Sequence, residues 1–171
     1  EKIVFNQFDV IGVIGENGAG KTTLINAILG EVPYDGQIKR YFDKDEIGIQ
    51  FQNNEYNELL KVYELIQIVK GVRKFDDKLK EEIQHYNLDK ILNTRINKIS
   101  GGELQRLTLF LLLTENSNFY IFDELTTGLD FKKRNKLLNI VHKKTEEKTV
   151  LIVTHYFEEL LNWVSKLLIL Y

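Results

Sequence analysis

The residues best suited to chemistry stand at positions 15–23, where the sequence reads GENGAGKTT. The spacing G-x-x-x-x-G-K-[ST], between an apolar run and a helix-forming segment, is typical of a loop that wraps a chain of phosphates. Its glycines let the backbone curl around an anion, and the first N–H groups of the following helix would point at that anion. Lys21 would reach the outer phosphates, and the hydroxyl of Thr22 would ligate Mg²⁺. The alternative is a plain glycine turn between a strand and a helix.

Two carboxylates, Asp123 and Glu124, close an apolar segment that begins at Asn118. A strand that is hydrophobic along its whole length is usually central in a parallel sheet, and ligands of open α/β sheets bind at the carboxyl ends of such strands. Asp123 would hold Mg²⁺, directly or through water, and Glu124 would be the general base for an attacking water molecule. The alternative is that both acids are simply solvated at the end of a strand.

The segment Ser100-Gly101-Gly102-Glu103 has the S-x-x-E spacing of a capping box, in which Ser100 caps a helix and Glu103 bonds back. A capped helix that begins with two glycines also presents free N–H groups and a positive dipole to whatever lies in front of it. Both interpretations can hold together.

His155 and Gln52 each stand at the end of an expected strand. A neutral imidazole at position 155, beside the strand of Asp123, could hydrogen-bond a γ-phosphate or the surroundings of an attacking water, although a lone histidine is more often structural. The amide oxygen of Gln52 could ligate Mg²⁺ or orient water, and its position before a helical segment makes it a candidate hinge. Taken alone, Gln52 carries little information.

The elements that must position these residues follow from the pattern of apolar residues, glycines and the single proline. Strands are expected at 2–5, 10–14, 37–41, 47–51, 118–124, 149–153 and 166–171; helices are expected at 21–29, in three short pieces within 57–99, from 100 onward, at 131–144 and at 156–164. The alternation of strands and helices predicts an α/β fold with a mainly parallel sheet. We expect a core of residues 1–52 and 100–171, with residues 53–99 inserted as a small α-helical subdomain.

Composition narrows the class of protein further. With 171 residues, of which 43% are hydrophobic, the chain can form one α/β domain that carries a small subdomain. A net charge of −2 gives no electrostatic argument for binding nucleic acid, so no nucleic-acid partner is expected. The absence of cysteine excludes disulfides and thiolate metal sites, and suits a reducing cytoplasm. Because the chain starts with Glu1 and contains no Met, we expect it to be a fragment of a longer protein.

Taken in order, these segments resemble the nucleotide-binding domain of ATP-binding cassette (ABC) proteins. GENGAGKTT resembles the Walker A motif, Gln52 the Q-loop, ISGGELQR the signature motif, FYIFDE the Walker B strand with its catalytic glutamate, TTGLD the D-loop, and His155 in VTHYFEEL the switch histidine. The resemblance runs across nearly the whole chain. The signature motif is its most specific part, because other P-loop families lack it.

The resemblance implies a P-loop NTPase core that uses ATP and Mg²⁺. It implies Glu124, His155 and Gln52 as catalytic residues, Thr22, Gln52 and Asp123 at the metal, and nucleotide contacts from Gly15, Asn17, Gly18, Ala19, Gly20, Lys21, Thr22, Thr23, Ser100, Gly101 and Gly102. It further implies a head-to-tail dimer with two ATP molecules, in which Ser100, Gly101 and Gly102 of one subunit contact the γ-phosphate bound by Lys21 of the other. ATP binding would close this dimer, and hydrolysis would open it.

The sequence also departs from the family pattern. Leu125 stands where the family usually has proline, and Ile99 replaces the usual leucine of the signature motif. The family's adenine-stacking aromatic residue lies well upstream of the phosphate-binding loop, and Phe5 and Phe8 are poorly placed to replace it. We therefore expect base recognition, and the strands that follow Tyr171, to lie outside this chain.

The resemblance leads first to the ATPase subunit of an ABC transporter, at the cytoplasmic face of a membrane and attached through an integral membrane permease. In such transporters the helical insert and the Gln52 region contact the membrane-spanning partner. The alternative is a soluble ABC ATPase that acts on ribosomes or DNA, since SGGELQR is also similar to ribosome-recycling members. A third possibility, a small nucleotide or metabolite kinase, leaves the signature motif and the D-loop unexplained.

Overall fold

The computed structural model describes residues 3–39, 43, 46–51, 56–161 and 163–171. The strands are β1 (Val10–Gly15), β2 (Ile47–Gln50), β3 (Phe119–Asp123), β4 (Thr149–Thr154) and β5 (Lys166–Leu170). The helices are α1 (Lys21–Leu29), α2 (Val62–Lys70), α3 (Asp77–His85), α4 (Gly101–Leu113), α5 (Phe131–Lys144) and α6 (Phe157–Leu160). By contacts, the chain forms two compact units, Glu1–Gln52 with Asn116–Tyr171, and Asn53–Glu115.

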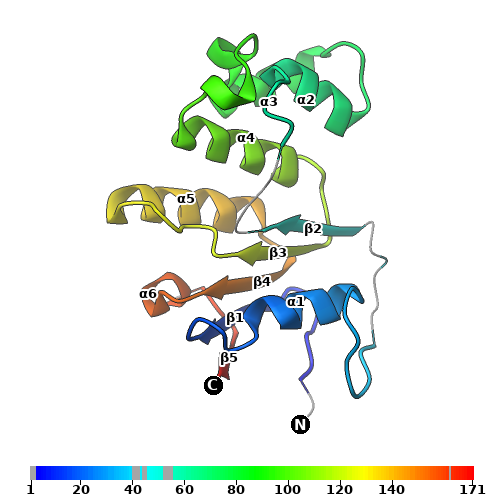
Figure 1. Cartoon of the computed structure of the whole chain (residues 1–171), viewed down its shortest axis with the longest axis vertical. Coiled ribbons are helices and arrows are strands. Elements are labelled where there is room, and N and C mark those ends of the chain that lie inside the picture. Colours follow the sequence, from blue (N-terminus) through cyan, green and yellow to red (C-terminus); the bar gives the residue numbers. More distant parts are fainter. Residues whose placement is uncertain (1–2, 40–42, 44–45, 52–55, 162) are drawn as a thin grey trace. The chain divides into compact units, whose positions relative to one another are not determined.

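The first unit is built on a five-stranded sheet in the order β2-β3-β4-β1-β5, with every pair of neighbours parallel (Figure 1). The neighbouring strands β3 and β4, which lie inside the sheet, are buried at every position, as the continuous apolar runs in their sequences predict. The parallel register puts the carboxyl ends of β1, β3 and β4 at one edge of the sheet. The expected α/β fold with a parallel sheet is confirmed.

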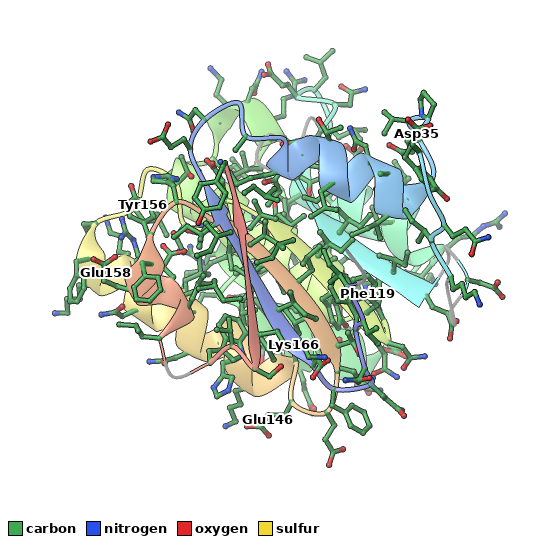
Figure 2. The ribbon with its side chains drawn as sticks, turned by 90° about the horizontal axis from the view of Figure 1, so that it is seen from below. Asp35, Phe119, Glu146, Tyr156, Glu158 and Lys166 are labelled. Carbon is green, nitrogen blue, oxygen red and sulfur yellow. The ribbon has the colours of Figure 1, made fainter. Side chains whose placement is uncertain are left out.

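Helices cover both faces of this sheet: α1 lies on one side, and α5 and α6 lie on the other (Figure 2). The apolar face of α1 joins a core cluster in which Ile25 and Ile28 pack with Ile11, Val13 and Val153 of the sheet. Burial of such side chains stabilises the fold by about 1.5–3 kcal/mol each. This packing fixes the position of α1 on the sheet, and with it the end of the loop that joins β1 to α1.

The opposite face is packed so closely that one strand position has no room for a side chain. A Cβ atom at Gly12 would lie 2.7 Å from Cδ1 of Leu160 and 3.1 Å from Cγ1 of Val164. Glycine at this position therefore lets α6 and the segment after it approach β1. The approach brings the residues of α6 close to the carboxyl ends of the central strands.

The second unit is helical. Where three short helices are expected, the structure has α2, α3 and two 3-10 turns, Asp89–Ile91 and Ile96–Lys98. Its packing includes an edge-to-face contact between Tyr86 and Phe110 of α4, with ring centroids 5.5 Å apart. By contacts, residues 100–115 group with this unit, whereas the sequence expectation ends the insert at residue 99. The domain boundaries themselves remain a prediction.

Two predicted strands are wrong where the structure describes them, because residues 3–5 and 37–39 are not in strands. Their sequences suit extended backbone, but a strand also needs a partner whose backbone can bond to it. Near the N-terminus the carbonyl of Val4 accepts instead from the side chain of Lys166, with Nζ and O 2.9 Å apart. Strand propensity alone therefore misplaced both elements.

The predicted helix at 156–164 is also too long, because α6 covers only Phe157–Leu160. Leu161 leaves the helical region, with φ −58° and ψ 131°, and so ends the helix after a single turn. Within the described residues, no helix combines the length and the apolar character that a membrane span requires.

Candidate functional site

The loop between β1 and α1 has the backbone shape that its glycines predict. Gly18 and Gly20 have φ angles of 90° and 92°, in the region that side-chain-bearing residues rarely adopt. A Cβ atom at either position would meet no atom within 4 Å, so backbone conformation, and not crowding, requires glycine there. Gly15 differs, since its Cβ would lie 2.7 Å from the carbonyl oxygen of Leu170, and glycine there lets β1 pack against β5.

The first turn of α1 offers several donors to an anion. Gly20, at the N-cap, supplies no side chain to cap the helix. The N–H groups of the first helical residues, Lys21, Thr22 and Thr23, have no acceptors within the helix. In the loop itself, Ala19 N–H donates to the carbonyl of Glu16 at 3.1 Å, and Asn17 is exposed at the turn. Free N–H groups together with the positive end of a helix dipole suit a phosphate.

The ammonium group of Lys21 lies inside this loop. The residue is only 7% exposed, and Nζ donates to the carbonyl oxygens of Gly15 at 2.8 Å and Glu16 at 2.9 Å. An ammonium group has three N–H donors, so one remains for a ligand. The lysine is thus held against the loop that is expected to carry the phosphates.

Thr22 and Asp123 meet between α1 and the end of β3. The hydroxyl of Thr22 donates to Oδ2 of Asp123 at 3.3 Å. The pKa of Asp123 is raised, mainly because the carboxyl group is buried. The nearby charge of Glu124 also raises this pKa, and the hydrogen bond from Thr22 opposes the rise. A hydroxyl beside a carboxylate is an all-oxygen donor set, which suits Mg²⁺. These two residues therefore fit the metal role that the resemblance assigns to them.

Glu124 and His155 stand together at the same edge. His155 Nδ1 lies 3.6 Å from Oε1 of Glu124, and the other carboxylate oxygen accepts from the hydroxyl of Thr127 at 3.1 Å. The N–H of Glu124 donates to the carbonyl of Val153 at 2.8 Å, which ties it to β4. Its φ of 52° is unusual for a non-glycine residue, and such strain is common at functional sites. This carboxylate is placed to accept a proton.

The capping box at the start of α4 is present as the sequence predicts. Ser100 Oγ accepts from the N–H of Glu103 at 3.3 Å, and Oε2 of Glu103 accepts from the N–H of Ser100 at 2.7 Å. Ser100 is exposed, so it is not sealed in its own core. A Cβ atom at Gly101 or Gly102 would meet no atom within 4 Å. The packing of a single chain therefore gives no reason for these two glycines.

The structure brings the predicted site residues together in part. The Lys21 loop, the Thr22–Asp123 pair and the Glu124–His155 pair gather at the carboxyl edge of the sheet in the first unit. The signature residues Ser100, Gly101 and Gly102 belong to the helical unit. Gln52, predicted at the metal and in catalysis, lies outside the described residues.

The sequence analysis did not identify the side chains that support the Glu124–His155 pair. Thr127 bonds directly to Glu124, and its place within TTGLD, three residues after the glutamate, is the only sequence signal for it. Glu159 is buried beside the same loops, and Arg134 faces it. No sequence pattern distinguishes Glu159 from its exposed neighbour Glu158.

Comparison with known proteins identifies the family of this chain. The sequence pattern of the family described as ABC transporter matches residues 2–127. Protein McbF of Escherichia coli is 34% identical over 166 residues, which cover 90% of this chain and 67% of that protein. The zinc import ATP-binding protein ZnuC of Buchnera aphidicola is 35% identical over 158 residues, or 85% of this chain and 62% of that protein. The chain spans 67% of the length of Protein McbF and 29% of the length of an ABC transporter ATP-binding protein of Methanocaldococcus jannaschii, so it corresponds to only part of these relatives.

Solved structures agree with the sequence relatives. An RNase-L inhibitor structure has a TM-score of 0.76 and 26% identity, covering 96% of this chain and 32% of its own. An ATP-binding subunit of an ABC transporter has a TM-score of 0.81 at 20% identity, covering 99% of this chain and 77% of its own, and this likeness concerns the fold alone. The chain therefore belongs to the ABC transporter family, with the P-loop fold of that family's nucleotide-binding domains.

Proposed function

We propose that this chain binds and hydrolyses ATP as the nucleotide-binding domain of an ABC transporter. One observation carries the proposal: the Thr22–Asp123 pair and the Glu124–His155 pair stand at the same sheet edge as the Lys21 loop. An anion-binding loop, an all-oxygen donor pair and a carboxylate base are the parts that phosphoryl transfer to water requires.

In this proposal each group of the chain has a separate task. The loop N–H groups and Lys21 bind and neutralise the phosphates, and Thr22 with Asp123 holds the metal ion. Bound Mg²⁺ would neutralise charge that develops on the phosphate oxygens. Glu124 accepts the proton of the attacking water, and His155 holds that carboxylate in place from the neighbouring strand. Gln52 is proposed as a further metal ligand and hinge.

We also propose that two copies close head to tail over the nucleotide. The support is Ser100, exposed at the start of α4, together with the uncrowded positions of Gly101 and Gly102. Glycines that their own chain does not require suit a helix end that another molecule must approach closely. In this arrangement the core comprises residues 1–52 and 100–171, and residues 53–99 form the inserted helical subdomain.

Transport is proposed from the names of the relatives, among them zinc import and methionine import ATP-binding proteins. The partner would be an integral membrane permease, and this chain would lie at the cytoplasmic face of the membrane. The alternative is a soluble ABC ATPase that acts on ribosomes or DNA, since one solved structure with 27% identity contains an archaeal ribosome recycling factor. Purification of the intact protein with its partners separates the two: a co-purifying polytopic membrane protein supports transport, and ribosomes support the alternative.

The variant Glu124→Gln tests hydrolysis directly. It removes the base but keeps the metal pair, so ATP should still bind while kcat falls by about 10²–10⁴-fold and an ATP-bound dimer accumulates. The matched control is Glu146→Gln, at an exposed residue labelled in Figure 2, which should leave turnover unchanged. Normal turnover by a folded Glu124→Gln protein would show that the base lies elsewhere.

A further inference from the structure

A buried carboxylate that the proposed mechanism does not use lies just behind the site. The carboxyl side chain of Glu159 is only 2% exposed. One of its oxygens, Oε1, accepts from the hydroxyl of Thr126, and the other accepts from the hydroxyl of Thr154 at 2.8 Å. Nε of Arg134 lies 3.3 Å from Oε1 and supplies the opposite charge. Glu159 is thus held by hydrogen bonds from two hydroxyls and by charge attraction to one guanidinium, whose Nε makes no hydrogen bond among the described residues.

The partners of Glu159 come from the two segments that carry the candidate catalytic pair. Thr126 stands two residues after Glu124, in the loop that leaves β3. Thr154 is the last residue of β4 and directly precedes His155. A single carboxylate therefore joins the loop of the base to the loop of the histidine, across two strands that are adjacent in the sheet.

A second connection runs from the same cluster to the imidazole. The guanidinium of Arg134 lies 3.6 Å from the centroid of the Tyr156 ring, and that ring lies 3.9 Å from the ring of His155. The N–H of Tyr156 donates to the hydroxyl of Thr154 at 3.0 Å. Arg134, which is paired with Glu159, thus packs against the residue that packs on His155. Both Glu124 and His155 are therefore connected to the cluster around Glu159.

The energetics favour a role beyond stability. A buried ion pair rarely contributes more than apolar residues of similar volume would, because both charges must leave water. Glu124 has a left-handed backbone, a strained conformation that persists only where the surroundings fix it. The hydrogen bond of Thr126 to Glu159 fixes the chain two residues beyond this strained position.

We propose that Glu159 is a positioning residue for ATP hydrolysis. It holds the loop after β3 and the loop after β4 in the relative placement that puts His155 Nδ1 3.6 Å from Oε1 of Glu124. Glu159 itself does not touch the reacting atoms. The inference rests on the proposed function, since a positioning role has meaning only if the pair takes part in hydrolysis.

The test compares Glu159→Gln with Glu158→Gln in the full-length protein, with turnover expressed per ATP-binding site. Glu158 is the adjacent carboxylate of α6, exposed and labelled in Figure 2, so it is a matched control. Displacement of the pair should lower kcat by about 10–100-fold. KM for ATP should stay within about twofold, because the phosphate-binding loop is untouched. Glu158→Gln should match the wild type in both quantities.

A double variant separates positioning from a general loss of structure. If Glu159 acts through the pair, adding Glu159→Gln to Glu124→Gln should lower kcat no further than Glu124→Gln alone. Should Glu159→Gln fail to fold, Thr126→Val removes one hydroxyl at nearly constant volume and should lower kcat by about 3–10-fold, again at unchanged KM.

The outcomes distinguish this inference from the proposed function. Wild-type kcat per site in folded Glu159→Gln or Thr126→Val would overturn the positioning role and leave the proposed function standing. A rise in KM at unchanged kcat would overturn it as well, because it would place Glu159 in nucleotide binding. If the intact wild-type protein does not hydrolyse ATP, both proposals fail together.

Discussion

His155 Nδ1 and Glu124 Oε1 lie 3.6 Å apart, at the carboxyl ends of two adjacent parallel strands. The separation is within reach of charge attraction but longer than a hydrogen bond. Catalytic hydrogen bonds are often long without substrate and tighten when it binds. The two groups come from segments 31 residues apart in sequence, so only the sheet brings them together.

Lys21→Ala should abolish productive ATP binding. It removes the ammonium group that sits inside the loop and would face the outer phosphates. We expect turnover, measured as phosphate release from the intact protein, to fall by at least about 100-fold. ATP binding, measured separately, should be lost as well. Lys143→Ala, at an exposed residue of α5, is the control and should retain activity. Unchanged turnover in Lys21→Ala would refute the phosphate-binding assignment.

Thr22→Val should weaken the use of Mg²⁺ more than the binding of nucleotide. The substitution keeps the volume of the side chain and removes the oxygen that lies 3.3 Å from Asp123 Oδ2. A titration of turnover against Mg²⁺ should shift to higher concentration by about tenfold or more. In the wild type, EDTA should stop hydrolysis and excess Mg²⁺ should restore it. A variant with an unaltered Mg²⁺ requirement would remove Thr22 from the metal site.

Gly102→Leu should separate folding from function. Leucine has higher helix propensity than glycine by about 1 kcal/mol, and no atom lies within 4 Å of the position that its Cβ would take. The melting temperature should therefore hold or rise. In the Glu124→Gln background, however, the ATP-dependent dimer should disappear from size-exclusion profiles, because a second copy could no longer approach the helix end. A dimer of normal stability would contradict the head-to-tail arrangement.

Asp9→Asn should destabilise the fold in a pH-dependent way. Burial would raise the pKa of Asp9, but the bonds from Lys166, Asn6 and Ser165 outweigh it and lower that pKa. The stabilisation is thus present above the unfolded pKa of about 3.9 and is lost as the pH falls through the lower folded value.

Urea unfolding checks this prediction. At pH 7 the free energy of unfolding should drop by about 1–2 kcal/mol in Asp9→Asn, and the gap from the wild type should narrow as the pH falls below the unfolded pKa of about 3.9. Asp35→Asn, at the exposed residue labelled in Figure 2, should have no such effect. A gap that stays constant with pH would mean that the carboxylate charge of Asp9 does not stabilise the fold.

The fold was predictable where the sequence is apolar without interruption. The central strands around Ile121 and Leu151 are hydrophobic at nearly every position, because both faces of the sheet are covered. The segments 3–5 and 37–39 have residues that suit strands, yet the sequence cannot say whether a partner strand is in reach. The early end of α6 at Leu160 likewise depends on packing that no local pattern encodes.

The site was predictable to the extent that its chemistry lies in short motifs. Lys21, Thr22, Asp123 and Glu124 follow from spacing and from their places at strand ends. The contact between Thr126 and Glu159 spans 33 positions and involves two residue types that are common on surfaces. Such support around a site comes from tertiary structure, so a single sequence does not disclose it.

The hydrogen bonds of Lys21 to two loop carbonyls have a consequence for affinity. A free lysine side chain carries about 2 kcal/mol of rotamer entropy, which a ligand must otherwise remove when it binds. Here the chain's own folding has already immobilised the ammonium group before any ligand arrives. If the proposed site binds ATP, the incoming triphosphate would meet a preorganised cation, and a larger share of the interaction energy would remain as binding.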